Sequence, residues 1–181
     1  MAENREHGGA SHAMDKMQDA VGAVVGKMSA AMGGGASTEF VKNAALSDRY
    51  EIAAADIAMR RSKSEQVRSF AAKMVEDHMT STHQLQSALQ MSETDDALLE
   101  LLDEELDSRR AGLLDHLEKA PDDDFDKTYL DQQVAAHEEG VTLFRNYAGS
   151  GDNPQLRSLA MATLPVLERH RHHVKELRSL I

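Results

Sequence analysis

Apolar residues recur every three or four positions along four long stretches of this chain, which is the spacing of one face of an α-helix. Helix-capping and helix-ending residues separate the stretches: Ser62–Glu65, Pro121, Gly149, Gly151 and Pro154. The pattern predicts helices over roughly residues 39–61, 65–90, 122–148 and 154–181. The expected caps are Ser37 and Thr38 for the first helix and Asp152 or Asn153 for the fourth. The predicted fold class is therefore all-α.

The links between these helices predict how they are ordered in space. The first and second helices, and the third and fourth, are joined by only a few residues, so each pair is expected to form an antiparallel hairpin. Residues 91–120 contain a further helical pattern and are long enough to cross from one hairpin to the other. This arrangement predicts a ferritin-like four-helix bundle over residues 37–181, with one long helical crossover between the second and third bundle helices.

Residues 1–36 are interpreted as an N-terminal appendage. Six apolar residues at three- and four-residue spacing predict an amphipathic helix there: Met14, Met17, Val21, Val24, Met28 and Ala31. Gly33–Gly35 would end this helix and provide a hinge. We interpret the segment as a loosely attached helix or a disordered tail, and the alternative is an arm that pairs with another subunit or a membrane surface.

The charge balance excludes one class of partner. With 20 Lys and Arg against 31 Asp and Glu, the formal charge is −11, and the chain lacks the basic excess that phosphate binding needs. No nucleic-acid partner is therefore expected. Residues 91–126 carry 14 acidic and 3 basic side chains, which accounts for the whole net charge. We interpret this acidic crossover as a solvated face, and a homo-oligomer through it or through the N-terminal helix stays open.

One ionisable residue interrupts the apolar stripe of each long helix: Glu51, His78, His137 and His170. Each is separated by seven or eleven residues from apolar positions of its own stripe, a distance that returns to the same helix face. Each also lies near the midpoint of its helix, and the midpoints of antiparallel helices with short hairpins share a layer. The pattern therefore predicts that the four side chains converge at the centre of the core.

Such a cluster requires compensation, because an unpaired buried charge costs several kcal/mol. Three imidazoles and one carboxylate can complete a tetrahedral shell around a divalent metal ion. Zn(II) or Fe(II) fits this set, and Mn(II), Cu(II) and Ni(II) stay open. The alternative is a metal-free network in which Glu51 is paired with one histidine and hydrogen-bonded to the others. Residues expected to support the ligands are Asp48, Thr82, Gln133 and Thr163.

The remaining histidines of the helical region are interpreted differently. His83 and His116 lie off the apolar stripes, so we expect them at the surface. Di-iron enzymes take a Glu-x-x-His motif from each of two helices, whereas the residues three before the three inward histidines are Val75, Val134 and Leu167. The sequence therefore argues against a di-iron ferroxidase or oxygenase, and an enzymatic role has little support.

Four groups of residues stand around the inward positions: Phe40–Lys42 with Glu51, Val67–Ala71 leading to Met74–His78, Phe125–Leu130 with His137, and Leu164–Leu167 with His170. Together they resemble the bacterial ferritin-like family catalogued as domain of unknown function 4142. The resemblance covers residues 38–178, and it implies a ferritin-like bundle and the same four inward residues. It implies no established reaction, and many members of that family look exported.

The predicted function is a metal-binding, ferritin-like bundle that holds one mononuclear divalent ion through three His and one Glu, in stress response or metal handling. The alternative is a non-enzymatic interaction or stress protein whose inward cluster is a metal-free polar network. No apolar run is long enough for a transmembrane segment, and the N-terminal residues lack the basic charge of a signal peptide. A cytoplasmic location is expected, and the periplasm is the alternative that the family resemblance implies.

Overall fold

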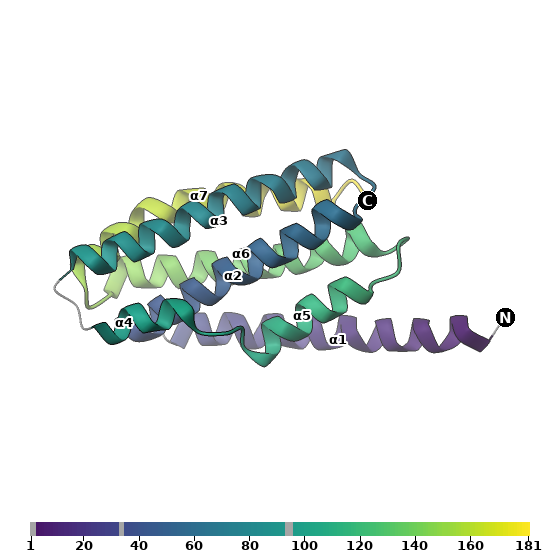
Figure 1. Ribbon diagram of the computed structural model, residues 1–181, viewed down its shortest axis with the longest axis horizontal. Helices are drawn as coiled ribbons and strands as arrows, with labels where there is room; N and C mark the ends of the chain where they lie inside the picture. The colour runs from purple at the N-terminus through teal and green to yellow at the C-terminus, as the bar shows by residue number, and fades with distance from the viewer. Residues whose placement is uncertain (1–2, 33–34, 93–95) are drawn as a thin grey trace.

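The structure, a computed structural model, describes the backbone of residues 3–32, 35–92 and 96–181, and the side chains of residues 12–28, 35–92 and 96–181. Every regular element in these ranges is helical, which confirms the predicted all-α class (Figure 1). The elements are α1 (Glu3–Met32), α2 (Ser37–Arg61), α3 (Glu65–Met91), α4 (Asp96–Glu100), the 3₁₀ turn η1 (Leu101–Asp103), α5 (Ser108–Lys119), α6 (Phe125–Ser150) and α7 (Pro154–Arg178).

Four long helices, α2, α3, α6 and α7, pack around a common interior. The most extensive contacts are between α6 and α7 and between α2 and α3, the two predicted hairpin pairs. Contacts between α3 and α7 and between α2 and α6 join the two hairpins. The segment that connects α3 to α6 passes over α2, which contacts α4, η1 and α5 in turn (Figure 1).

The helix ends follow the predicted punctuation in two places and depart from it in a third. Ser64 caps α3 by accepting the Val67 backbone N–H, and Asn153 caps α7 by accepting the first backbone N–H groups of that helix. At α2 the predicted caps were Ser37 and Thr38, and this prediction is wrong. Asp152 of the α6–α7 link accepts the Ser37 backbone N–H at 3.1 Å instead.

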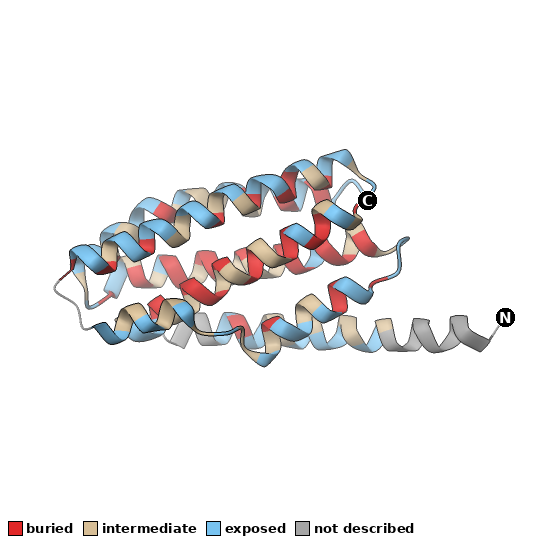
Figure 2. Cartoon of the chain, viewed as in Figure 1, coloured by how far each residue is buried: buried red, intermediate tan, exposed pale blue. Residues whose placement is uncertain are grey.

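Two apolar clusters fill the interior, one toward each end of the long helices. The first includes Phe70 and Tyr129, and the second includes Phe40 and Phe144. Figure 2 shows buried residues concentrated where the long helices face one another, with exposed positions on their outer sides. A layer of buried polar side chains separates the two clusters. On α3, for example, His78 lies between Met74 of the first cluster and Leu85 of the second.

The predicted N-terminal amphipathic helix is present as α1, and it packs along α6 and α5. Gly33 and Gly34 of the predicted hinge, and the side chain of Ala31, lie outside the described residues. The division of the chain at residue 36 stays a prediction. Across the part of the chain that the structure describes, no helix combines the length and the apolar character that a membrane crossing requires.

Candidate metal centre

The three inward histidines come from three different helices and meet in the buried polar layer. His78 lies on α3, His137 on α6 and His170 on α7, and all three are buried. Their ring centroids are 5.5–5.9 Å apart in every pairing. The rings are inclined to one another rather than stacked, so each can present an edge nitrogen to a shared point.

The nitrogen atoms of these rings are spaced as metal ligands are. One ring nitrogen from each histidine lies within 4.8 Å of one from each of the other two. Each ring also has one buried nitrogen without a hydrogen-bond partner among the described residues: Nε2 of His78, Nε2 of His137 and Nδ1 of His170. Buried polar atoms are normally paired in folded proteins. Three such atoms in one small cluster therefore point to a missing common partner.

The second nitrogen of each ring is held by a hydrogen-bond acceptor. Nδ1 of His78 is 2.8 Å from an Asp48 carboxylate oxygen, and Nε2 of His170 is 2.8 Å from an Asp77 carboxylate oxygen. Nδ1 of His137 is 2.9 Å from the backbone carbonyl oxygen of Gln133. An acceptor on one nitrogen places the proton there and leaves a lone pair on the other. Histidines that bind metals in proteins are commonly oriented in this way.

The electrostatics of the layer keep two of the rings neutral. Burial, together with the positive charge of a protonated His78, lowers the pKa of His137 to about 3. Burial, with His137 close by, lowers the pKa of His170 to about 4. Burial is the largest influence on the pKa of His78 and acts to lower it, but the hydrogen bond that His78 donates to Asp48 and the negative charges of nearby carboxylates together raise that pKa. At neutral pH, His137 and His170 thus have lone pairs ready to bind a cation.

Glu51 is buried in the same layer but is not part of the closest group. Its Oε1 is 3.7 Å from Nδ1 of His137, the nitrogen that already faces the Gln133 carbonyl. Its Oε2 is buried without a hydrogen-bond partner among the described residues. Burial raises the pKa of Glu51, while the positive charge of a protonated His78 opposes the rise. The three histidines form the compact group, and Glu51 as a fourth ligand stays a prediction.

The residues expected to support the ligands have mixed outcomes. Asp48 contacts His78 as expected, and Thr82 donates to Asp48 from the other side at 3.2 Å. Gln133 supports His137, but through its backbone carbonyl rather than its side chain. Thr163 is buried, and its hydroxyl has no hydrogen-bond partner among the described residues.

Asp77 is a supporting residue that the apolar stripe of α3 does not predict. It immediately precedes His78 on α3, so its side chain is turned by about 100° from the inward face, toward α7. There it accepts from His170, and Lys73 pairs with its other oxygen at 2.9 Å. The adjacency of an acidic residue to an inward histidine was the available signal.

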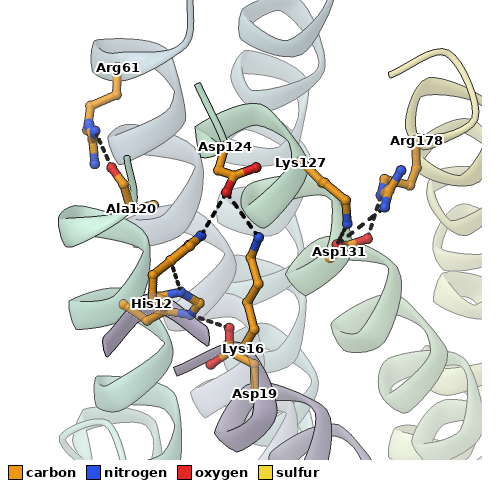
Figure 3. A network of polar contacts seen from close by, with 10 residues as sticks. His12, Lys16, Asp19, Arg61, Ala120, Asp124, Lys127, Asp131 and Arg178 are labelled. Atoms are coloured by element: carbon orange, nitrogen blue, oxygen red, sulfur yellow. Dashed lines mark hydrogen bonds and ion pairs between the residues drawn. The ribbon is translucent and has the colours of Figure 1, made fainter. Parts of the chain in front are cut away.

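The prediction that His116 lies at the surface is wrong. Its side chain is buried, with Nδ1 at 2.6 Å from an Asp19 carboxylate oxygen and Nε2 at 2.9 Å from Nδ1 of His12. Both partners belong to α1, which contacts α5. His12 and Asp19 are labelled in Figure 3. His83 is exposed, as expected.

Comparison with known proteins agrees with the fold and leaves the chemistry open. A family model described as Domain of unknown function (DUF4142) matches residues 23–177, and the chain belongs to this family. A solved structure described as "CopM in the Cu(II)-bound form" is similar, with a TM-score of 0.64, 14% sequence identity, and coverage of 80% of this chain and 96% of that one. At this identity the likeness shows the fold alone. Among curated proteins, no sequence matches this chain significantly.

Proposed function

We propose that this protein binds one divalent transition-metal ion through His78, His137 and His170, with Glu51 as the fourth ligand. The observation that carries the proposal is the cluster of three buried imidazole nitrogens that lack partners among the described residues, in rings whose other nitrogens are already held. A divalent cation satisfies all three nitrogens at once. Without an ion these nitrogens need other partners, because leaving a buried polar group unpaired costs about 1–3 kcal/mol.

We propose Cu(II) as the first metal to test. Imidazole nitrogen binds Cu, Zn, Fe and Ni, and a given site of this kind has its highest divalent affinity for Cu(II). The structurally similar CopM is described in a Cu(II)-bound form, which supports the same choice. Zn(II) and Fe(II) fit the donor set as well. In a cell, the availability of each metal decides which ion fills such a site as much as the affinity does.

The proposed role is metal handling by sequestration rather than catalysis. Three imidazoles and a carboxylate would supply four ligands, the full number of a closed structural site, and a catalytic metal needs an open position. All four side chains are buried, so a substrate would have no approach to the ion without rearrangement of the long helices. The buried layer would then bind the ion, and the exposed surface would be available for contacts with other proteins.

We also propose a specific arrangement of the long helices. We take α2, α3, α6 and α7 as a ferritin-like four-helix bundle, with the segment from α4 to α5 as its long crossover. The closed set of contacts between neighbouring long helices supports this. In that arrangement residues 37–181 form the metal-binding unit, and residues 1–36 are an appendage with a different role.

The experiment that tests the proposal is a metal titration of protein purified without a His-tag or chelator. We expect about one Cu(II) or Zn(II) per chain and a rise in melting temperature on loading, because an ion that binds the folded chain selectively must stabilise it. His137→Gln removes one central nitrogen while keeping a polar side chain of similar size. It should abolish both the stoichiometric binding and the thermal shift.

The matched control is His83→Gln, which changes an exposed histidine on α3 outside the cluster. It should bind and stabilise like the unmodified protein. Equal binding by the two variants would mean that the titration reports surface histidines. A protein that takes up no ion and gains no stability would support the metal-free network and overturn the proposal.

A further inference from the structure

The solvent-facing side of α1 is apolar over the described residues 12–28. Six large apolar side chains there are 54–65% exposed, more than most apolar residues elsewhere in the chain: Met14, Met17, Val21, Val24, Val25 and Met28. Five of them are the stripe that predicted an amphipathic helix. An amphipathic helix at a protein surface normally turns this face inward, so α1 is docked the other way round.

The polar and small residues of α1 face the rest of the molecule and hold it there. Lys16 pairs with Asp124 at 3.3 Å, and Asp19 accepts from the buried His116 (Figure 3). Lys27 pairs with Glu138 further along α6. These contacts fix the rotation of α1 about its own axis, and the apolar stripe is thereby left outside.

Close packing at the glycines of α1 reinforces this orientation. A Cβ atom on Gly26 would clash with a Glu139 carboxylate oxygen and would lie 3.0 Å from Arg109. Glu139 is in turn paired with Arg109 at 2.9 Å and with Arg110 at 3.2 Å, so moving its side chain aside would disturb two ion pairs. The face of α1 that carries Gly26 is therefore narrow enough to pack closely against α5 and α6. Rotating α1 about its own axis would place large side chains in this narrow space.

The exposed stripe has the spacing of a coiled-coil seam. Met14, Met17, Val21, Val24 and Met28 alternate intervals of three and four residues, which are the a and d positions of two heptads. The flanking e and g positions include Gln18, Ala20, Val25 and Lys27. Lys27 is the charged residue among these four, and it is already paired with Glu138 of α6. Two copies of this surface could therefore meet without like-charge repulsion along the seam, and Ala20 and Val25 would widen the apolar contact.

We propose that the seam formed by Met14, Met17, Val21, Val24 and Met28 is a docking surface for the same helix of a second copy of this chain. A seam that is complementary to itself suits a two-fold dimer, in which both subunits use the same patch. The helix is already formed and anchored, so pairing requires little further ordering of the backbone. The proposal is independent of the metal centre, which lies among the four long helices.

The observations favour a second copy over a membrane surface. Surface-binding helices usually carry Lys or Arg on the polar side for anionic headgroups and large aromatic or Leu residues on the other. Between residues 12 and 28 the Lys and Arg residues are Lys16 and Lys27, and both are ion-paired with α6 or the turn before it. No aromatic residue other than His12 occurs there, and the net charge of −11 repels anionic lipid.

The first test measures the mass of the full chain in solution by light scattering after size exclusion. We expect a dimer of the 19.9 kDa chain that becomes a monomer in the double variant Val21→Glu/Val24→Glu. Both positions are exposed and Glu is a good helix former, so helical content and metal binding should be retained. The matched control Met161→Glu changes an exposed apolar residue of α7 and should leave the dimer intact.

A second test uses the absence of cysteine from the chain. Val21 lies at the centre of the seam, so Val21→Cys should cross-link to its own copy under mild oxidation whether the helices run parallel or antiparallel. Met161→Cys should not. A monomeric unmodified chain, a double variant that stays dimeric, or equal cross-linking of both cysteine variants would overturn the proposal. So would a monomer that sediments with phosphatidylglycerol vesicles, because the seam would then bind lipid.

Discussion

At the scale of single residues, each inward histidine has two nitrogens in different situations. One nitrogen of His78 faces the Asp48 carboxylate, and one nitrogen of His170 faces the Asp77 carboxylate. The corresponding nitrogen of His137 faces a backbone carbonyl. A carboxylate orients the ring and makes its other nitrogen a stronger donor to a metal. The supporting acids therefore decide affinity almost as much as the ligands do, and Asp77 is the more accessible of the two.

We predict that Asp77→Ala weakens metal binding by about 10–100-fold, the usual effect of removing a residue that orients a ligand. The reason is that His170 loses the acceptor that fixes its ring, while its ligating nitrogen stays in place. Competition titration against a chelator of known affinity measures the change. Asp131→Ala, which removes a carboxylate paired with Lys127 and Arg178 on the outside of α6, is the control. If both variants bind alike, the orienting role of Asp77 is refuted.

The predictable residues were those whose position depends on the periodicity of their own helix. His78, His137 and His170 were expected in one layer from stripe and midpoint alone, and the structure brings the three together. The burial of His116 could not be predicted in this way. It depends on Asp19, which lies 97 residues earlier in the chain, and on which face of α1 docks against α5.

At the scale of the elements, the start of α2 depends on the link between α6 and α7. Asp152 accepts hydrogen bonds from the backbone N–H of Ser37 and from the hydroxyl of Tyr147. Its carboxylate therefore connects the start of α2 to the end of α6. Its negative charge also lies at the positive end of the α2 dipole. The hydrogen bonds from Ser37 hold the pKa of Asp152 below its ordinary value.

We predict that Asp152→Ala lowers the free energy of unfolding by about 1 kcal/mol, the usual effect of losing a helix N-cap. Because the pKa of Asp152 is lower in the folded chain, its contribution is complete above the ordinary pKa of 3.8 and is lost as the pH falls below it. Urea unfolding at neutral pH and at acidic pH measures both effects. The difference between variant and unmodified protein should shrink in acid.

Asp115→Ala is the control for this measurement, because Asp115 forms an exposed ion pair with Lys119. Exposed i,i+4 pairs of this kind contribute about 0.3–0.5 kcal/mol, which is less than the loss predicted for Asp152→Ala. A loss for Asp152→Ala no larger than that for Asp115→Ala, or one that is unchanged in acid, would contradict the capping role.

The long helices were predicted closely because capping residues mark their ends in the sequence itself. Ser64 and Asn153 cap the helices that follow them, and α7 starts at the predicted Pro154. The start of α2 was predicted less well, since its cap comes from a residue 115 positions away. For α1, the stripe of Met and Val residues predicted a helix but not which face packs. Ion pairs such as Lys16 with Asp124 decide that.

At the scale of the whole molecule, two apolar clusters enclose one polar layer. The clusters bury the apolar surface that stabilises the fold. The layer removes polar side chains from bulk water, so they need hydrogen-bond or metal partners inside the protein. The all-α class and the family were predictable from sequence, because they depend on periodicity and on local segments such as Phe125–Leu130. The distance of Glu51 from the histidine group was not, since it depends on side-chain positions across helices.

The central claim is that one ion binds between the three histidines. The most direct measurement is a crystal structure of the metal-loaded protein with data collected at the absorption edge of the metal. We expect one anomalous peak about 2.0–2.1 Å from a nitrogen of each of His78, His137 and His170. Peaks confined to exposed residues such as His83 or His172, with no density between the three rings, would contradict it.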